Sequence, residues 1–115
     1  MKTTSNIQEI DQQIQIIKAQ LLALGDLRPG SLTQQYNVCG KLHCRCKDPK
    51  NPRRHGPYYQ LSYVHQGKST SRFIRAPHLP EIRKQLATYR EFRRLTQRWV
   101  ALAMRKAEYL LKAVR

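Results

Sequence analysis

The segment NVCGKLHCRCKDPKNPRRHGPYY, residues 37–59, carries all three cysteines of the chain within eight positions, with a histidine soon after them. Two glycines and three prolines are spread through it, so regular secondary structure cannot run far there. An irregular loop of this kind needs something to hold it. How the segment is held therefore governs how the elements on its two sides are joined.

The thiols and imidazoles of this segment have the composition of a zinc site. A structural zinc ion takes four thiolate or imidazole ligands in a tetrahedral arrangement. That number is supplied within 17 residues by Cys39, Cys44, Cys46 and His55. His43 and Asp48 compete with His55 as the fourth ligand. We therefore predict one structural Zn²⁺ held by the three cysteines, with the fourth ligand left open by the spacing alone.

Other uses of the thiols are alternatives to zinc. The common zinc pattern of two separated CxxC pairs is absent, so thiols without a metal and a redox pair stay open. An iron–sulfur cluster usually needs four cysteines, and the chain has three. The seven acidic residues are scattered, and no third group stands out to orient a thiol nucleophile. We therefore expect no enzymatic activity.

Charge is the second strong signal of the sequence. The 115 residues carry a net charge of +15, and the pI is about 10.4. Residues 1–27 hold two basic and three acidic residues, whereas residues 28–75 hold ten basic and one acidic residue. Such concentration is typical of a protein that binds a polyanion, although an acidic protein partner or a plain basic surface is the alternative. We predict binding to nucleic acid, with DNA favoured over RNA.

Cations on the cysteine segment and on the strands after it are the predicted contacts to this partner. So many cations on one short loop repel each other unless an anion is present, and tyrosines beside them can stack on bases. For Tyr58 and Tyr59 taken alone, packing in the core is favoured over stacking on bases. The predicted nucleic-acid-binding residues are Lys41, Arg45, Lys47, Lys50, Arg53, Arg54, Tyr58, Arg72 and Arg75.

Residues 5–24 are predicted to form a helix. Six apolar side chains recur at steps of three and four, which is the a/d seam of a heptad pattern, and the opposite face is rich in glutamine. This seam suits another helix, in the same chain or in a second one. The alternative function is therefore a structural protein that forms a homodimer, or docks on a larger enzyme such as a recombinase, through Ile7, Ile10, Ile14, Ile17, Leu21 and Leu24.

The middle of the chain predicts a β-hairpin. Residues 58–75 are rich in β-branched and aromatic side chains, and Gln66–Gly67 lies between the two arms as a two-residue turn. The register places Leu61 and Arg72 on one face, and it leaves the buried face undecided. A lone hairpin is marginally stable, so it must lean on a helix or on the metal loop. Before it, Ser31 is placed to cap a short helical turn that runs through Gln35.

Residues 78–115 predict a long helix with Pro80 in its first turn. Its predicted apolar stripe consists of Ile82, Leu86, Tyr89, Thr96, Val100, Ala103, Ala107, Leu110 and Val114, widened by Phe92, Trp99 and Leu111. A basic ridge runs along another side through Arg83, Arg90, Arg94, Arg98, Arg105 and Lys112. The stripe is predicted to pack on the N-terminal helix.

Together these elements predict an α+β fold in one domain, residues 1–115. Its parts are a coiled-coil-like helix (1–25), a cysteine-rich basic loop (26–57), a hairpin (58–75) and a long helix (78–115). No apolar run approaches the roughly 18 residues of a membrane-spanning helix. The N-terminal stretch MKTTSNIQEIDQQ lacks the apolar core of a signal peptide, so we expect a cytoplasmic protein.

The chain also resembles a family of small uncharacterised bacterial and archaeal proteins, a domain of unknown function. The resemblance is carried by the strings RPGSL, YNVCGK, CRC, HGPYYQLSY and LPEIRKQL between Arg28 and about Arg94. It implies little about activity. It does favour His55 as the fourth metal ligand, because His55 lies in the shared HGPYY string, whereas His43 lies in a variable gap.

Overall fold

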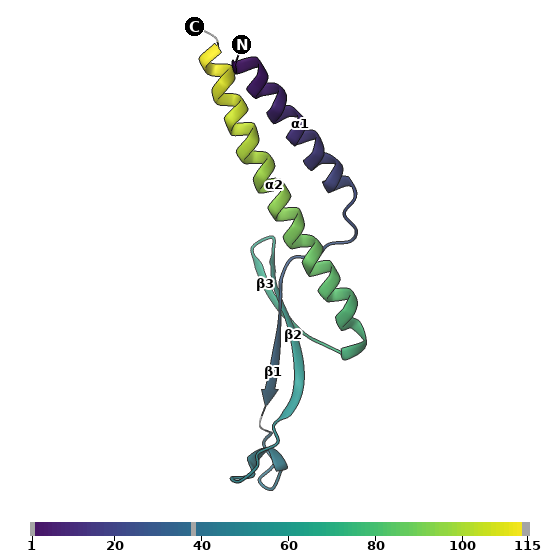
Figure 1. Ribbon diagram of the computed structural model, residues 1–115. Coiled ribbons are helices and arrows are strands. Elements are labelled where there is room, and N and C mark those ends of the chain that lie inside the picture. The colour runs from purple at the N-terminus through teal and green to yellow at the C-terminus, as the bar shows by residue number, and fades with distance from the viewer. Residues whose placement is uncertain (1, 38, 114–115) are drawn as a thin grey trace. The chain divides into compact units, whose positions relative to one another are not determined.

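A computed structural model describes residues 2–37 and 39–113 of the chain (Figure 1). The elements follow in the order α1 (Lys2–Leu22), β1 (Ser31–Asn37), η1 (Arg45–Lys47), β2 (His55–His65), β3 (Lys68–Ile74), η2 (Ala76–His78) and α2 (Leu79–Ala113), where η marks a 3₁₀ turn. The α+β class is as predicted. No helix of the described chain is long and apolar enough to cross a membrane.

The chain divides into two compact units. One, the helical unit, comprises residues 1–27 and 87–115, and the other, the sheet unit, comprises residues 28–86. Each unit has its own cluster of buried apolar side chains. The long helix α2 supplies residues to both, and the prediction of a single domain stays a prediction.

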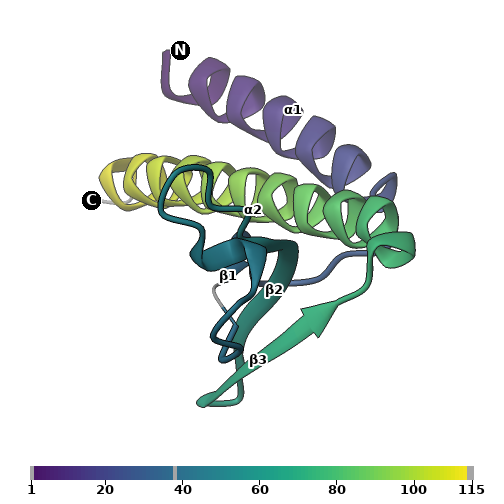
Figure 2. The same ribbon diagram turned by 90° about the horizontal axis from the view of Figure 1, so that it is seen from below.

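The helical unit is an antiparallel pair of helices that run side by side in both ribbon views (Figures 1 and 2). The ammonium group of Lys106 lies 2.7 Å from the Asp11 carboxylate, and that of Lys18 lies 5.2 Å from the centre of the Trp99 ring. The helices are therefore antiparallel, because the later residue of α1 meets the earlier residue of α2. The buried core between them consists of Ile10, Ile14, Ile17, Leu95 and Leu102. The predicted packing of the two helices is confirmed.

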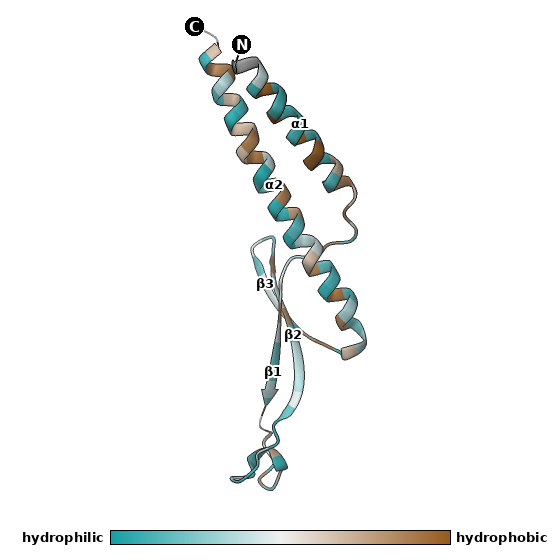
Figure 3. Ribbon diagram, viewed as in Figure 1, coloured by the Kyte–Doolittle hydropathy of each residue, from teal (hydrophilic) through white to brown (hydrophobic). Residues whose placement is uncertain are grey.

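The face of α2 that packs in the helical unit differs from the predicted stripe. Leu95 and Leu102 are buried there, and neither belongs to that stripe, whereas Val100 is 62% exposed. Apolar residues coloured brown recur along the length of α2 in Figure 3. Two apolar rows compete on this helix, and α1 covers the row that also brings Lys106 to Asp11. In this half of the helix Trp99 of the predicted stripe packs against the core, whereas the prediction was wrong for Val100, Leu110 and Leu111, which are exposed. Val114 of the stripe lies outside the described residues.

The sheet unit contains a three-stranded antiparallel sheet in the order β1-β2-β3. The predicted β2–β3 register is observed, with Leu61 opposite Arg72, and the turn lies at Gln66–Gly67, where both residues have positive φ. The predicted helical turn from Ser31 to Gln35 is wrong, because these residues belong to β1, which pairs with β2. The third strand removes the weakness of a lone hairpin, since both sides of β2 are now hydrogen-bonded.

One face of this sheet packs on the first turns of α2. Leu61 has no exposed surface, and Ile82 and Leu86 cover it from the helix, with Leu32, Tyr63 and Ile74 around them. At the edge of this core, the Arg83 guanidinium lies 5.7 Å from the centre of the Tyr59 ring. Tyr59 therefore belongs to the packed face, as favoured for that ring. Tyr58 is exposed on the other face, so the preference for core packing was wrong for that ring.

Candidate metal centre

The cysteine loop joins β1 to β2 at the end of the sheet opposite the β2–β3 turn (Figure 1). Its two ends lie side by side, because Asn37 of β1 pairs with His55 of β2. Within the loop, the backbone N–H of Arg53 donates to the carbonyl of Arg45 at 2.9 Å, and that of Lys47 donates to Cys44 at 3.0 Å. These bonds fold the Pro/Gly-rich segment back on itself without extended secondary structure.

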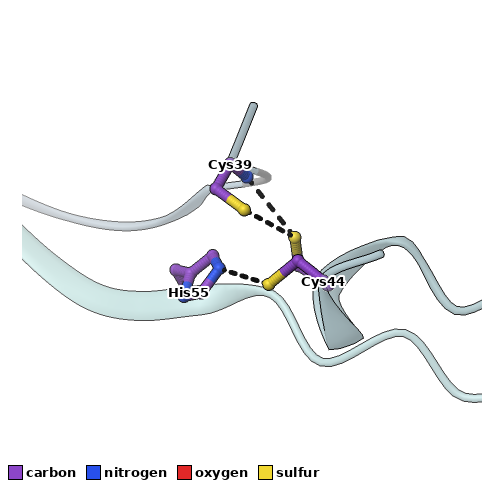
Figure 4. Close-up of side chains that lie close together, drawn as sticks. Cys39, Cys44 and His55 are labelled. Atoms are coloured by element: carbon purple, nitrogen blue, oxygen red, sulfur yellow. Dashed lines mark hydrogen bonds between the residues drawn. The ribbon is translucent and has the colours of Figure 1, made fainter. Parts of the chain in front are cut away.

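The loop brings three thiols and one imidazole together. Cys39 follows β1, Cys44 precedes η1, Cys46 lies in η1, and His55 is the first residue of β2. Their potential ligand atoms all lie within 4.8 Å of one another. The Cys39 and Cys46 sulfurs are 3.6 Å apart, and the Cys44 sulfur is 3.0 Å from Nε2 of His55 (Figure 4). Two thiolates on one tetrahedral Zn²⁺ are about 3.8 Å apart, so these spacings suit a shared ion.

The pKa values of the Cys44 and Cys46 thiols are shifted in opposite directions. Burial raises the pKa of the Cys46 thiol, which is only 2% exposed. The pKa of the Cys44 thiol is lowered to about 6, chiefly by a hydrogen bond from the backbone N–H of Cys46 and then by its contact with Cys39. The backbone N–H of Cys39 also points to the Cys46 sulfur at 3.4 Å. Such N–H donors stabilise the negative charge of metal-bound thiolates.

The two competing ligands lie outside this cluster. His43 is exposed on the loop, and the carboxylate of Asp48 accepts a hydrogen bond from the backbone N–H of Lys50 at 3.0 Å. Within the described residues, Cys39, Cys44, Cys46 and His55 form the one group with the geometry to hold a metal ion. The structure thus assembles the four ligands predicted from sequence and resemblance, and that they bind a metal stays a prediction.

The predicted nucleic-acid contacts all lie on the surface of the sheet unit. Lys41, Arg45, Lys47, Lys50, Arg53, Arg54, Tyr58, Arg72 and Arg75 are all exposed. Within the described residues, none of the eight cations has a carboxylate partner. The sheet unit as a whole holds twelve basic and two acidic residues. Its surface therefore carries positive charge that the chain itself does not neutralise.

Four of these nine predicted contacts line two pockets. Lys41 and Tyr58 line a pocket of about 360 Å³ together with Cys39, Cys44 and His55, so both lie directly beside the candidate metal ligands. Arg72 and Arg75 line a second pocket, of about 390 Å³, with Arg28. Arg28 was not among the predicted contacts. Its guanidinium donates to the side-chain oxygen of Gln85 at 3.0 Å, so at least part of its role is to tie the chain before β1 to α2.

The chain belongs to a family described as a domain of unknown function (DUF6788), whose family model matches residues 7–84. The matched range includes the four candidate ligands and the whole sheet. No curated protein and no solved structure matches the chain.

Proposed function

We propose that this DUF6788 protein is a small, non-enzymatic nucleic-acid-binding protein whose basic loop is stapled by one structural Zn²⁺, with DNA as its main partner. The observation that carries the proposal is the position of the ligand cluster. Three cysteines and His55 converge at the base of a loop that presents six exposed cations, Lys41, Arg45, Lys47, Lys50, Arg53 and Arg54.

Zinc is the metal that fits this donor set best. Thiolate and imidazole ligands in a closed set of four are typical of structural zinc, whereas calcium and magnesium prefer oxygen. The ordering of an irregular loop would then draw its free energy from metal binding. A reducing cytoplasmic compartment would keep the three thiols available for the metal.

Elemental analysis of the purified protein tests the metal site. We expect one equivalent of zinc in the wild type and in His43→Ala, and a strong loss in His55→Ala, because only His55 belongs to the cluster. The two variants are matched, since each removes one histidine from the same segment. Full zinc content in His55→Ala, or the absence of metal from the wild type, would contradict the proposed site.

The cations would act by neutralising phosphates. A bound Zn²⁺ with three thiolates and one neutral imidazole carries a net charge of −1, so the site itself offsets little of the loop's positive charge. Each phosphate contact to duplex DNA lowers the slope of log affinity against log salt concentration by roughly 0.9. The loop alone therefore predicts a steep salt dependence, whatever the base sequence.

A salt titration of binding to a labelled DNA duplex tests this step. We expect Arg53→Ala and Arg54→Ala each to make the slope shallower by about one unit. The control is Arg93→Ala, which removes the same charge from an exposed position of the helical unit. Equal slopes for the loop variants and the control would assign the binding to net charge alone. No measurable binding to DNA or RNA at low salt would refute the proposed function.

A second candidate function is docking through the helical unit. The predicted seam residues Ile10, Ile14 and Ile17 are already buried against α2, so they are engaged within the chain. Other apolar side chains of the helical unit are exposed, namely Ile16, Leu22, Val100, Met104, Leu110 and Leu111. A solution mass of one 13.5 kDa chain would contradict the homodimer.

A further inference from the structure

The sheet has a second face that no helix of the sheet unit covers. Residues opposite each other in the register share a face. Two rows across the three strands therefore define this open face, Ser31–Ser62–Ser71 and Thr33–Gln60–Phe73. Its members are Ser31, Thr33, Gln35, Tyr58, Gln60, Ser62, Val64, Ser69, Ser71 and Phe73. None of them is acidic.

Two aromatic rings stand on this face, whose other members are polar apart from Val64. Phe73 is 70% exposed and Tyr58 is 42% exposed. Phe73 lies opposite Gln60, and Tyr58 is two residues from Gln60 along β2, so the two rings are diagonal neighbours on one face. Diagonal neighbours of this kind have backbones about 7–8 Å apart. The Phe73 and Tyr58 rings therefore lie at neighbouring positions on the exposed face.

Polar side chains of the open face form hydrogen bonds with one another between neighbouring strands. The Ser62 and Ser71 hydroxyls lie 3.2 Å apart, and the side-chain amide of Gln35 donates to the side-chain oxygen of Gln60 at 2.8 Å. These contacts tie the three strands together across the open face. Among the members of the open face, Phe73, Val64 and Tyr58 are the large apolar side chains exposed to solvent, and two of these three are aromatic.

Cations lie at the rim where the open face meets the metal loop. Arg75 directly follows Ile74, the last residue of β3, and Ile74 pairs with Tyr59, so Arg75 lies at the end of β3 that is nearest the start of β2. Tyr58 also lines the pocket beside the ligand cluster, which Lys41 shares. The surface therefore runs from Phe73 across Tyr58 to the metal loop, with positive charge at that end.

We propose that the open face binds single-stranded nucleic acid, with successive bases stacked on Phe73 and Tyr58 and the backbone phosphates beside Arg75 and Lys41. The inference rests on the proposed function and narrows it to strands whose bases are unpaired. Base faces are hidden inside a duplex, whereas in a single strand they are free to stack on protein aromatics.

The composition of the face favours this occupant over another protein. Only Tyr58, Val64 and Phe73 among its members are apolar, and the rest are serine, threonine and glutamine. The core of a protein–protein interface is more apolar than this. The lack of carboxylates on the face and the cations at its rim complement a polyanion, and an aromatic pair stacks on any base.

Fluorescence anisotropy with a labelled oligothymidine, a matched oligouridine and a DNA duplex tests the inference on the full zinc-loaded chain. We expect Phe73→Leu and Tyr58→Leu each to weaken single-strand binding by about 5- to 150-fold, the equivalent of 1–3 kcal/mol per stacked base. Leucine keeps the surface apolar and removes the ring. The matched control is Val64→Ala, which changes an exposed apolar side chain of the same face and should have little effect.

A direct readout of stacking comes from Phe73→Trp. We expect this variant to bind oligothymidine with the same affinity as the wild type. Binding should quench the fluorescence of the added tryptophan, whereas the wild type, whose one tryptophan is Trp99, should show no such quenching.

The outcomes separate this inference from the proposed function. Salt-dependent duplex binding with no loss of single-strand affinity in Phe73→Leu would overturn only the stacking surface. The same conclusion would follow if duplex and single-strand affinity fell equally, or if Phe73→Leu changed the solution mass instead. Absence of binding to every probe would overturn both proposals.

Discussion

At the scale of single residues, the candidate metal centre depends on a glycine that offers no ligand atom. Gly56 follows the candidate ligand His55 and has a φ of +140°, in a region that is essentially restricted to glycine. A Cβ atom at this position would lie 2.8 Å from the carbonyl oxygen of Gln35 on the neighbouring strand. The β1–β2 pairing that positions His55 therefore requires a residue without a Cβ atom at position 56.

Gly56→Ala should weaken both the sheet and the metal site. Backbone strain of this kind costs about 1–3 kcal/mol, and the clash with Gln35 would push the start of β2 away from β1. The measurements are zinc affinity by competition with a chromogenic chelator and the free energy of unfolding in denaturant. The control is Gly40→Ala in the same loop, where a Cβ meets nothing within 4 Å. Equal effects of the two variants would contradict this role of Gly56.

At the scale of elements, α2 shows how two apolar rows on one helix compete for burial. The row that includes Val100, Ala103, Ala107 and Leu110 has good helical spacing, yet those residues are exposed. The row that includes Leu95 and Leu102 contacts α1. Spacing alone does not decide between two such rows, because the choice depends on the charges and shape of the partner helix.

Leu102→Ala should therefore destabilise the protein, and Val100→Ala should not. Leu102 is 5% exposed in the core with α1, and truncation of a buried leucine costs about 2–5 kcal/mol. Exposed substitutions usually change the free energy of unfolding by less than about 0.5 kcal/mol. Thermal or denaturant unfolding of both variants checks this. A larger loss for Val100→Ala would restore the stripe predicted from the sequence.

Some elements of the fold and of the candidate site can be predicted from the sequence, and others cannot. The two helices, the β2–β3 hairpin and its register, and the three clustered cysteines follow from periodicity, turn chemistry and ligand type, whereas His55 was favoured over His43 only by the family resemblance. Strand β1 does not, because Thr33, Gln34 and Gln35 have little apolar alternation and depend on pairing with β2. The need of a lone hairpin for further support was the available signal for it. The open face was not readable either, since it is defined only once β1 is placed.

At the scale of the whole molecule, the two units have separate buried clusters. The helical unit is built on Ile10, Ile14, Ile17, Leu95 and Leu102, and the sheet unit on Leu61, Ile82 and Leu86. The candidate metal ligands all belong to the sheet unit. Metal binding is therefore expected to stabilise one unit far more than the other.

Removal of zinc by a chelator should loosen the loop and leave the helical unit folded. We expect the amide of Lys47, which donates to Cys44 inside the loop, to lose protection from hydrogen exchange. The amide of Leu102 should exchange at an unchanged rate, because its surroundings contain no ligand. Hydrogen exchange followed by NMR, with and without chelator, measures both. An equal loss of protection at the two amides would show that the chain unfolds as one cooperative body.

The pairing of Asn37 with His55 has a consequence for the entropy of the chain. The segment between them leaves the sheet and returns to the same place, so β1–β2 pairing and metal coordination by the candidate ligands would close the same loop. Whichever formed first would remove most of the loop-closure cost from the other. Sheet pairing and metal affinity would therefore be thermodynamically linked. A change that strengthens the β1–β2 ladder should raise the affinity for the proposed metal, and the bound metal should in turn hold the two strands in register.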